Sequence, residues 1–223
     1  MTYGEVLSVN VAVPIRSTAK NVGITGINKR PVDHPVTVRA PGPKTTGLHS
    51  GLIGDQIFDV DHHGGDDQAV YAYAREDYDW WQVQLGRELP GGAFGENLTT
   101  AGVDVNGAVI GEKWRIGADL VLATTFGRVP CATFQARINE PRWIKRFTRE
   151  NRTGTYLRVV EPGEVKAGDR VEVVDRPAHG MTIARAFRAY TADASLLPEL
   201  LAVAELPVGV RASVAKRLSR SAT

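Results

Sequence analysis

Short apolar stretches, rich in Val, Ile and Thr and separated by glycine- and proline-rich turns, fill the chain from Gly4 to Ile183. Because β-branched residues fit the pleated, half-buried surface of a sheet, this pattern predicts strands. The predicted strands cover residues 6–12, 36–39, 68–73, 120–126, 155–160 and 170–174. The segments 111–116 and 168–173 resemble each other, since each begins with a turn and continues as an alternating strand.

The succession of short strands predicts a mainly β fold. Helical patterns are not interleaved regularly with the strands, and closing a sheet on itself removes its exposed edges. We therefore predict a closed or nearly closed antiparallel β-barrel with peripheral helices. One helix is expected at 75–85, where Tyr78, Trp81 and Leu85 fall at helical spacing, and another at 133–149, where Pro141 must end or restart it.

The composition changes to Ala, Leu and Arg after residues 175–180, and no strand pattern follows. Residues 1–178 are therefore predicted to form the barrel domain and residues 179–223 a small C-terminal three-helix domain. The helices would begin at Thr182, at Asp193 or Ser195, and at Pro207. Basic residues in this tail allow a helix-turn-helix DNA reader, but they form no recognition face, so a cap or dimerisation element is favoured and a homodimer is possible.

The charge balance points to a small-molecule partner. The chain has 27 basic and 25 acidic residues and a formal net charge of +2, so no strong field draws it to nucleic acid or to a membrane. The first residues show no signal-peptide pattern, and the apolar runs are far shorter than the ~20 residues that span a bilayer. With its single cysteine, the chain is expected to be cytoplasmic.

That cysteine, Cys131, is the first candidate for chemistry. It follows the apolar strand ending at Phe126, precedes a predicted helix and lies three residues after Arg128. A helix N-terminus and a neighbouring arginine both favour a thiolate, which is a good nucleophile and metal ligand. The residues alone leave open a second interpretation, in which Cys131 is a small buried hydrophobic side chain.

The polar segment 59–67 is the second candidate, because it holds His62, His63, Gly64, Gly65 and four carboxylates. Imidazole and carboxylate groups could bind a metal, although adjacent strand residues point to opposite faces and would not easily share one ion. The segment could equally be a polar turn whose glycines adopt positive φ. In an intermediate interpretation one histidine faces a pocket and the glycines let a ligand approach the backbone.

Two further segments could bind phosphate. The glycine-rich loop 91–100 contains Asn97, and Lys29 is followed directly by Arg30. Free backbone amides and paired cations both suit anions, but taken singly each segment is also ordinary for a turn or for solvated side chains.

Five motifs occur together in one order: Ile27-x-Lys29-Arg30-Pro31-Val32, Gly51-Leu52-Ile53-Gly54-Asp55, His63-Gly64-Gly65, Gly95-Glu96-Asn97-Leu98 and Arg128-x-Pro130-Cys131. This order resembles the MOSC family, named after the C-terminal domain of molybdenum cofactor sulfurase. The chain is most similar to bacterial stand-alone members that carry a three-helix domain after the barrel. It departs from them at 66–69, where relatives often have a proline and a basic residue, and at 132–134, where a bulkier aromatic start is expected.

The resemblance implies a molybdenum cofactor, molybdopterin with Mo, bound through Cys131 as the metal ligand. It implies that His63 and Gly64 line the pocket and that Lys29, Arg30 and Asn97 hold the pterin and its phosphate. Arg128 would stabilise the thiolate and nearby anionic groups, and His63 would orient the substrate or deliver a proton.

The implied activity is reduction of N-hydroxylated compounds, such as hydroxylaminopurine-type bases. No flavin, haem or iron–sulfur motif is present, so electrons would come from a separate reductase. A sulfur carrier, in which Cys131 holds a persulfide, or a module that handles the cofactor is the alternative.

Overall fold

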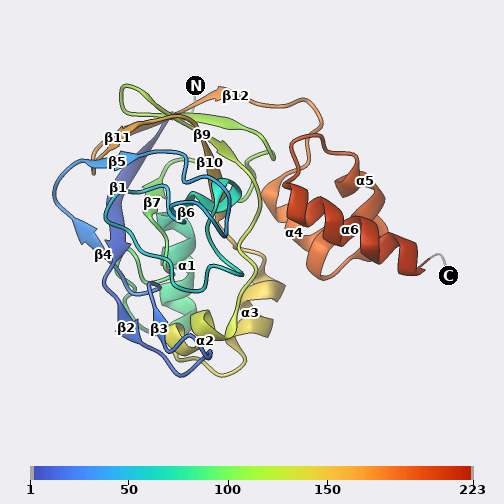
Figure 1. The fold of residues 1–223 in the computed structure, drawn as a ribbon, viewed down its shortest axis with the longest axis horizontal. Helices are drawn as coiled ribbons and strands as arrows, with labels where there is room; N and C mark the ends of the chain where they lie inside the picture. The colour runs from blue at the N-terminus through green and yellow to red at the C-terminus, as the bar shows by residue number, and fades with distance from the viewer. Residues whose placement is uncertain (1–2, 222–223) are drawn as a thin grey trace.

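The computed structural model describes residues 3–221 as a β-barrel with helices at its periphery (Figure 1). The barrel strands are β1 (Tyr3–Ala12), β6 (Val70–Ala74), β7 (Leu98–Ala101), β8 (Lys113–Ile116), β9 (Leu120–Thr124), β10 (Thr155–Glu161) and β12 (Arg170–Asp175). They are ordered β12-β8-β9-β10-β6-β7-β1, and β1 pairs with β12 to close the ring. The predicted mainly β barrel is therefore confirmed.

The remaining strands are short additions to this ring. β4 (Lys29–Val32) pairs with the end of β1, while β2 (Ile15–Arg16) pairs with β3 (Ile24–Thr25) and β5 (Val36–Val38) with β11 (Gly163–Val165). Strand β6 starts later than predicted because Asp66–Gln68 form the 3-10 turn η1. Of these short strands, β3 and β4 lie near the cavity described below, whereas β5 and β11 lie elsewhere on the barrel (Figure 1).

One strand pair departs from the antiparallel expectation. β6 and β7 run parallel, with Ala72 opposite Leu98, whereas the other pairings in the described sheets are antiparallel. The helix α1 (Arg75–Leu85) lies between these two strands in the sequence and carries the chain back to the starting end of β6. Such a crossover makes consecutive strands parallel, while a hairpin would make them antiparallel.

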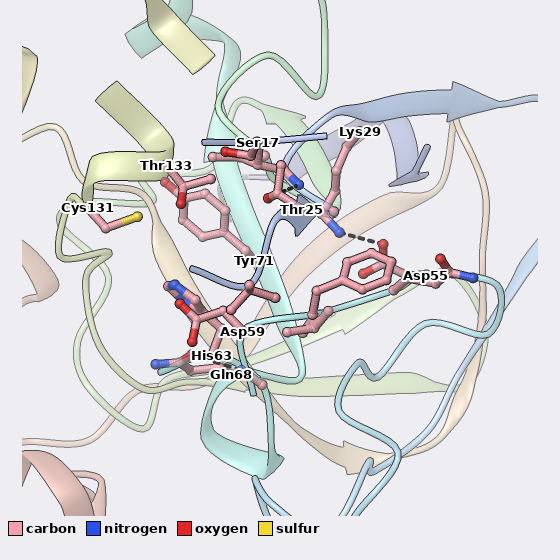
Figure 2. A pocket seen from close by; sticks show the side chains of 18 of the residues that line it. Ser17, Thr25, Lys29, Asp55, Asp59, His63, Gln68, Tyr71, Cys131 and Thr133 are labelled. Carbon is pink, nitrogen blue, oxygen red and sulfur yellow. Dashed lines mark hydrogen bonds and ion pairs between the residues drawn. The ribbon is translucent and has the colours of Figure 1, made fainter. Parts of the chain in front are cut away.

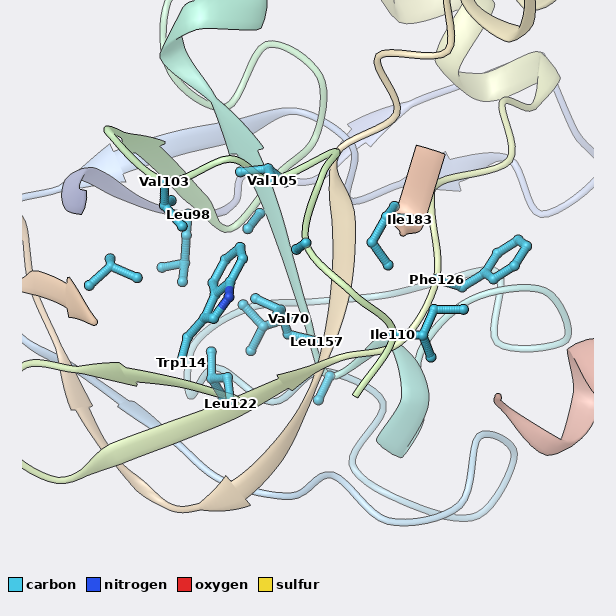
Figure 3. Close-up of a cluster of buried hydrophobic side chains, with 14 of the residues drawn as sticks. Val70, Leu98, Val103, Val105, Ile110, Trp114, Leu122, Phe126, Leu157 and Ile183 are labelled. Atoms are coloured by element: carbon cyan, nitrogen blue, oxygen red, sulfur yellow. The ribbon is translucent and has the colours of Figure 1, made fainter. Parts of the chain in front are cut away.

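The core of the barrel consists of aliphatic side chains around one buried indole (Figure 3). Trp114 from β8 is fully buried, and its Nε1 donates a hydrogen bond to the Glu112 carboxylate at 2.9 Å. Leu122 and Leu157, from β9 and β10, belong to the same cluster. Burying an indole with its N–H paired avoids the free-energy penalty of an unpaired polar group.

A second, aromatic cluster joins α1 to two helices that follow β9. These are α2 (Ala132–Ile138) and α3 (Trp143–Glu150), and the break between them confirms the interruption predicted at Pro141. Trp81 of α1 packs against Trp143 of α3 with ring centroids 4.6 Å apart, and Phe134 of α2 lies 5.0 Å from Phe147. This cluster fixes the start of α2, directly after Cys131.

The C-terminal segment contains α4 (Ile183–Thr191), the 3-10 turn η2 (Ala194–Leu196), α5 (Leu197–Leu201) and α6 (Val208–Ser221). Thr182 caps α4 as predicted, since its hydroxyl accepts a hydrogen bond from the Arg185 N–H at 3.1 Å. Ile183 and Ala186 of α4 belong to the hydrophobic cluster of the barrel, so the helices pack directly on it (Figure 1). The division of the chain at residue 178 stays a prediction.

Within residues 3–221, no helix has both the length and the apolar character that crossing a bilayer requires.

Candidate functional site

A cavity opens at the end of the barrel near β3 and β4, with a volume of about 790 Å³ that includes space open to solvent. Segments far apart in the sequence meet there: β4, the loop 55–64, β6, the loop 95–97 and the loop that leads from β9 to α2 (Figure 2). The lining contains both charged side chains and backbone atoms of glycines, which allows a polar ligand to lie close to the chain.

Cys131 lies at the edge of this cavity, immediately before the first residue of α2 (Figure 2). It is a free, half-buried thiol whose side chain packs partly against the aromatic cluster. The carbonyl of Cys131 accepts a hydrogen bond from the Gln135 N–H at 3.0 Å, which ties it to the first turn of α2. The sulfur is therefore held in place and open to the cavity, where a ligand can reach it.

Arg128 supplies a buried positive charge next to Cys131. Its guanidinium lies 4.5 Å from the Phe134 ring centre and 5.1 Å from that of Tyr71, and one N–H donates to the Phe94 carbonyl at 3.0 Å. Its Nε has no hydrogen-bond partner, and no carboxylate within residues 3–221 forms an ion pair with it. Burial lowers the pKa of Arg128, but the surrounding Tyr156, Tyr71 and Cys131 raise it by more, so the group stays cationic.

Asp55 organises the opposite wall. Its carboxylate accepts hydrogen bonds from Lys29 Nζ at 2.5 Å, Ser50 Oγ at 2.7 Å, Asn97 Nδ2 at 3.0 Å and the Ala12 N–H at 2.8 Å. Burial raises the pKa of Asp55, but the ion pair with Lys29 and the hydrogen bonds outweigh that effect and lower it. Lys29 and Asn97 are thus held rigidly, with the Lys29 charge neutralised by its partner.

His63 reaches the cavity from the polar segment that precedes β6. Burial, together with the positive charges of Arg128 and Lys20, lowers the pKa of His63 to about 3. The imidazole is therefore neutral at physiological pH and acts as a hydrogen-bonding group. His62 is exposed, and its Nδ1 lies 2.8 Å from the Asp59 carboxylate, so the two adjacent histidines face different surroundings.

The glycines after His63 let the backbone turn tightly. Gly64 and Gly65 have φ values of 85° and 82°, as the polar-turn interpretation predicts. A Cβ at Gly64 would lie 2.7 Å from the His49 carbonyl oxygen, so only glycine fits. Among the described residues, no three His, Cys, Asp or Glu side chains are grouped to hold a metal ion, which argues against the metal-site interpretation of segment 59–67.

Six of the candidate residues from the sequence line this one cavity: Lys29, His63, Gly64, Asn97, Arg128 and Cys131. Arg30 is exposed and lies outside the lining. It follows Lys29 on strand β4, where adjacent side chains point to opposite faces, so only one of the two can face the cavity.

The sequence reasoning missed several lining residues. Asp55 stands inside a quoted motif, but nothing indicated its role as the acceptor that binds Lys29 and Asn97. Lys20 forms an ion pair with Asp59, 39 positions later, and Tyr156 comes from β10. No local signal links such distant residues, because their proximity depends on how the loops fold over the end of the barrel.

The chain is similar to known proteins over most of its length. The model of the family described as the MOSC domain matches residues 59–172. The uncharacterized protein YflK of Bacillus subtilis is 31% identical over 220 residues, covering 96% of this chain and 95% of that protein. A protein of Gibberella moniliformis named Reductase is 31% identical over 156 residues, which cover 67% of this chain and 28% of that protein.

The fold has a solved counterpart. The crystal structure of YiiM from Geobacillus stearothermophilus matches with a TM-score of 0.77 at 26% identity, covering 96% of this chain and 99% of that one. The similarity therefore includes both the barrel and the C-terminal helices.

Proposed function

The chain belongs to the MOSC domain family, and we propose that it is a molybdenum-cofactor-dependent reductase of N-hydroxylated compounds, such as hydroxylaminopurine-type bases. The similarity to a fungal protein named Reductase supports a redox activity. The finer assignment depends on the chemistry of the cavity beside Cys131.

The observation that carries the proposal is the unpaired charge of Arg128 beside the free thiol. A buried guanidinium without a carboxylate partner is unfavourable unless an anion neutralises it. A pterin cofactor with its phosphate and dithiolene is such an anion, and a soft thiolate suits the metal that it carries. The residues of the cavity therefore fit the cofactor.

The roles of the other residues follow from their contacts. When bound, the molybdenum cofactor supplies the two-electron chemistry that removes oxygen from nitrogen. Cys131 would hold the metal, and Arg128 would bind the anionic part of the cofactor. Lys29 and Asn97, already fixed by Asp55, would form a rigid wall against the pterin, so that little ordering is needed on binding.

His63 and an external electron donor complete the scheme. The neutral imidazole would orient the N-hydroxyl group by a hydrogen bond. In the overall reaction the N–O bond breaks, and two electrons and two protons give the amine and water. The electrons would come from a separate reductase, because one cysteine cannot hold an iron–sulfur cluster.

The test compares protein made in a host that synthesises the cofactor with protein from a host that cannot. We expect molybdenum and pterin in the first preparation only, together with reduction of 6-N-hydroxylaminopurine by chemically reduced viologen. Cys131→Ser should lose both the metal and the activity. Ala132→Ser is the matched control, because it places the same side chain at an adjacent, exposed position outside the lining.

Two results would contradict the proposal. Metal-free wild-type protein that carries sulfane sulfur on Cys131 would support the sulfur-carrier alternative. Molybdenum retained in full by Cys131→Ser would show that the thiol is not the ligand.

A further inference from the structure

A second cavity lies between the barrel and the C-terminal helices, with a volume of about 1940 Å³ that includes space open to solvent. The barrel contributes Phe126, Val129 and Pro130 from the loop before Cys131. The helices contribute Tyr190 of α4 and residues 207–210 and 213 at the start of α6. Nothing in the proposed function so far uses this space or the helices that form its wall.

The two cavities meet at a shared boundary. Six residues line both of them: Lys20, His63, Gly64, Gln68, Cys131 and Tyr156. The thiol of Cys131 and the imidazole of His63 are therefore accessible from both sides. With a cofactor in the first cavity, the second cavity is a route by which another molecule can reach the atoms next to Cys131.

The walls of the second cavity are largely apolar. Val129 is 45% exposed and Val208 is 79% exposed, and they belong to opposite walls. Phe126 and Tyr190 also line the cavity, and they pack edge to face with centroids 5.5 Å apart. Apolar side chains contributed by both the barrel and the helices suit an apolar or aromatic ligand, which would remove them from water.

The charges around this cavity are mostly neutralised within the protein. Arg158 Nε donates to the Asp67 carboxylate at 2.9 Å and Lys20 is paired with Asp59, whereas Asp66 keeps its negative charge and accepts the Gly42 N–H at 2.9 Å. Lys44 and Asp61 add one charge of each sign at the rim. This cavity therefore has no counterpart of the buried, unpaired Arg128, and its charges favour an uncharged ligand over an anionic one.

The helical wall is held firmly. The Arg211 guanidinium donates to the Leu201 carbonyl at 2.7 Å, which joins the start of α6 to the end of α5. Asn151 Nδ2 donates to the Ala184 carbonyl at 2.9 Å, and the Ile183 N–H donates to the Ala108 carbonyl at 2.8 Å, which joins α4 to the barrel. A wall fixed in this way can discriminate between ligands by shape.

We infer that the second cavity is the substrate's approach to Cys131, and that the start of α6 determines which substrates enter. This inference rests on the proposed reductase activity. The ligand it predicts is an uncharged, flat heteroaromatic N-hydroxylated compound, whose ring lies between the 126–130 loop and residues 207–210. The N-hydroxyl group points to the boundary, where the neutral imidazole of His63 and the amide of Gln68 offer hydrogen bonds.

Gly209 provides a direct test. Among the described residues, no atom lies within 4 Å of the position that a Cβ at Gly209 would occupy, so a larger side chain fits the helix and extends into open space. Gly209→Phe should fill the groove without disturbing the barrel. Ala215→Phe is the matched control, because it lies on the same helix, is exposed and does not line the cavity.

The experiment uses protein purified from the cofactor-producing host and two substrates of different size. For Gly209→Phe we expect kcat/KM for 6-N-hydroxylaminopurine to fall roughly tenfold or more, as for other steric changes in a pocket, while that for N-methylhydroxylamine changes little. Molybdenum content should equal that of the wild type. Calorimetric binding of 6-aminopurine, the product, should weaken by a similar factor, and Ala215→Phe should behave as the wild type in each measurement.

Several outcomes would overturn the inference. Equal effects on the two substrates, an unchanged affinity for 6-aminopurine, or the same losses in Ala215→Phe would each do so. If the lower rate of Gly209→Phe were restored by more electron donor and not by more substrate, the second cavity would be the binding site of the electron donor instead. If Gly209→Phe fails to fold, as judged by circular dichroism, the same measurements are made on Val208→Trp, at the exposed neighbouring position, and the same results are expected.

The binding measurement separates this inference from the proposed function. Wild-type protein that reduces neither compound would contradict the reductase assignment. The affinity for 6-aminopurine, compared between Gly209→Phe and Ala215→Phe, would still decide whether the groove binds a flat heteroaromatic ligand.

Discussion

The two cavities that meet at Cys131 differ in how the chain builds them. The first lies at the end of the barrel, and its charged groups are buried and fixed by hydrogen bonds, as Asp55 fixes Lys29 and Asn97. The second is a gap between the barrel and separate helices, with exposed apolar side chains such as Val208 on its walls. The first therefore suits one polar ligand held in one position, and the second suits variable apolar ligands.

Because of this difference, substitutions in the first cavity affect the stability of the fold, whereas substitutions in the second cavity affect which ligands can bind. The buried ion pair of Lys29 and Asp55 in the first cavity must stay intact, because removing one partner leaves a buried charge that destabilises the folded state. Side chains at the mouth of the second cavity have few such constraints, and substitutions there change the stability of the fold little. The start of α6 can thus tolerate substitutions without any change in the first cavity, and under the inference above such substitutions would alter substrate preference.

The largest effect expected from this comparison concerns Asp55. Asp55→Ala removes the acceptor of four hydrogen bonds and leaves the Lys29 ammonium buried without its partner. We expect the free energy of unfolding to fall by about 3–5 kcal/mol, the usual result of breaking a buried ion pair. Chemical denaturation of the two proteins at neutral pH measures the difference.

Asp61→Ala is the control for that measurement, because Asp61 is exposed at the rim of the second cavity. It should change the free energy of unfolding by less than about 0.5 kcal/mol. Similar losses in both variants would remove the distinction between the two cavities.

A smaller effect is expected when the unpaired positive charge of Arg128 is removed. Arg128→Met keeps an apolar side chain between Phe134 and Tyr71 but removes the cation. Cofactor affinity should fall roughly tenfold to a hundredfold, as when a group that supports a metal site is lost. Molybdenum content after gel filtration, measured per protein chain, gives the result.

Arg30→Met is the matched variant, since Arg30 is exposed and lies outside the cavity lining. Unchanged molybdenum content in this variant would show that the loss in Arg128→Met comes from the buried cation at residue 128 and not from a general loss of positive charge. A loss as large as that of Arg128→Met would instead assign a phosphate contact to Arg30, as the order of motifs in the sequence implies.

The local pattern of the sequence predicted the elements that local chemistry decides. The helix predicted at 75–85 has those bounds in the structure, because Ala74 before it is extended and Gly86 after it adopts the left-handed conformation with φ of 64°. Strands such as β12 were found through alternation of apolar and polar residues. The two-residue strands β2 and β3 are too short to show any alternation, so no pattern indicated them.

Features that depend on distant contacts could not be predicted from local patterns. The parallel pairing of β6 with β7 depends on the path that the chain takes after α1. The ion pair between Lys20 and Asp59 and the second cavity depend on loops and helices that pack only in the folded protein. The order of motifs identified Lys29, His63, Asn97, Arg128 and Cys131 as candidates. It did not indicate that Asp55 binds Lys29 and Asn97.

The smallest effect concerns His63, which belongs to the boundary of both cavities. Its pKa is lowered from 6.5 to about 3 by burial and by the nearby charges of Arg128 and Lys20. The unfolded chain therefore binds more protons than the folded chain between these two values, so the stability of cofactor-free protein falls as the pH falls below 6.5. At pH 5 the loss from this group is about 2 kcal/mol, from about 1.36 kcal/mol per pH unit.

His63→Gln should lack that part of the acid dependence when the free energy of unfolding is measured by urea denaturation between pH 7 and 5. His34→Gln serves as the control, because the His34 side chain is 66% exposed and lies outside both cavities. The same acid dependence in His63→Gln and in the wild type would mean that the pKa of His63 is not lowered in the folded protein, so that His63 binds a proton below pH 6.5. Below that pH the boundary would then carry a positive charge, and the second cavity would favour an anionic ligand over the uncharged one inferred from its walls.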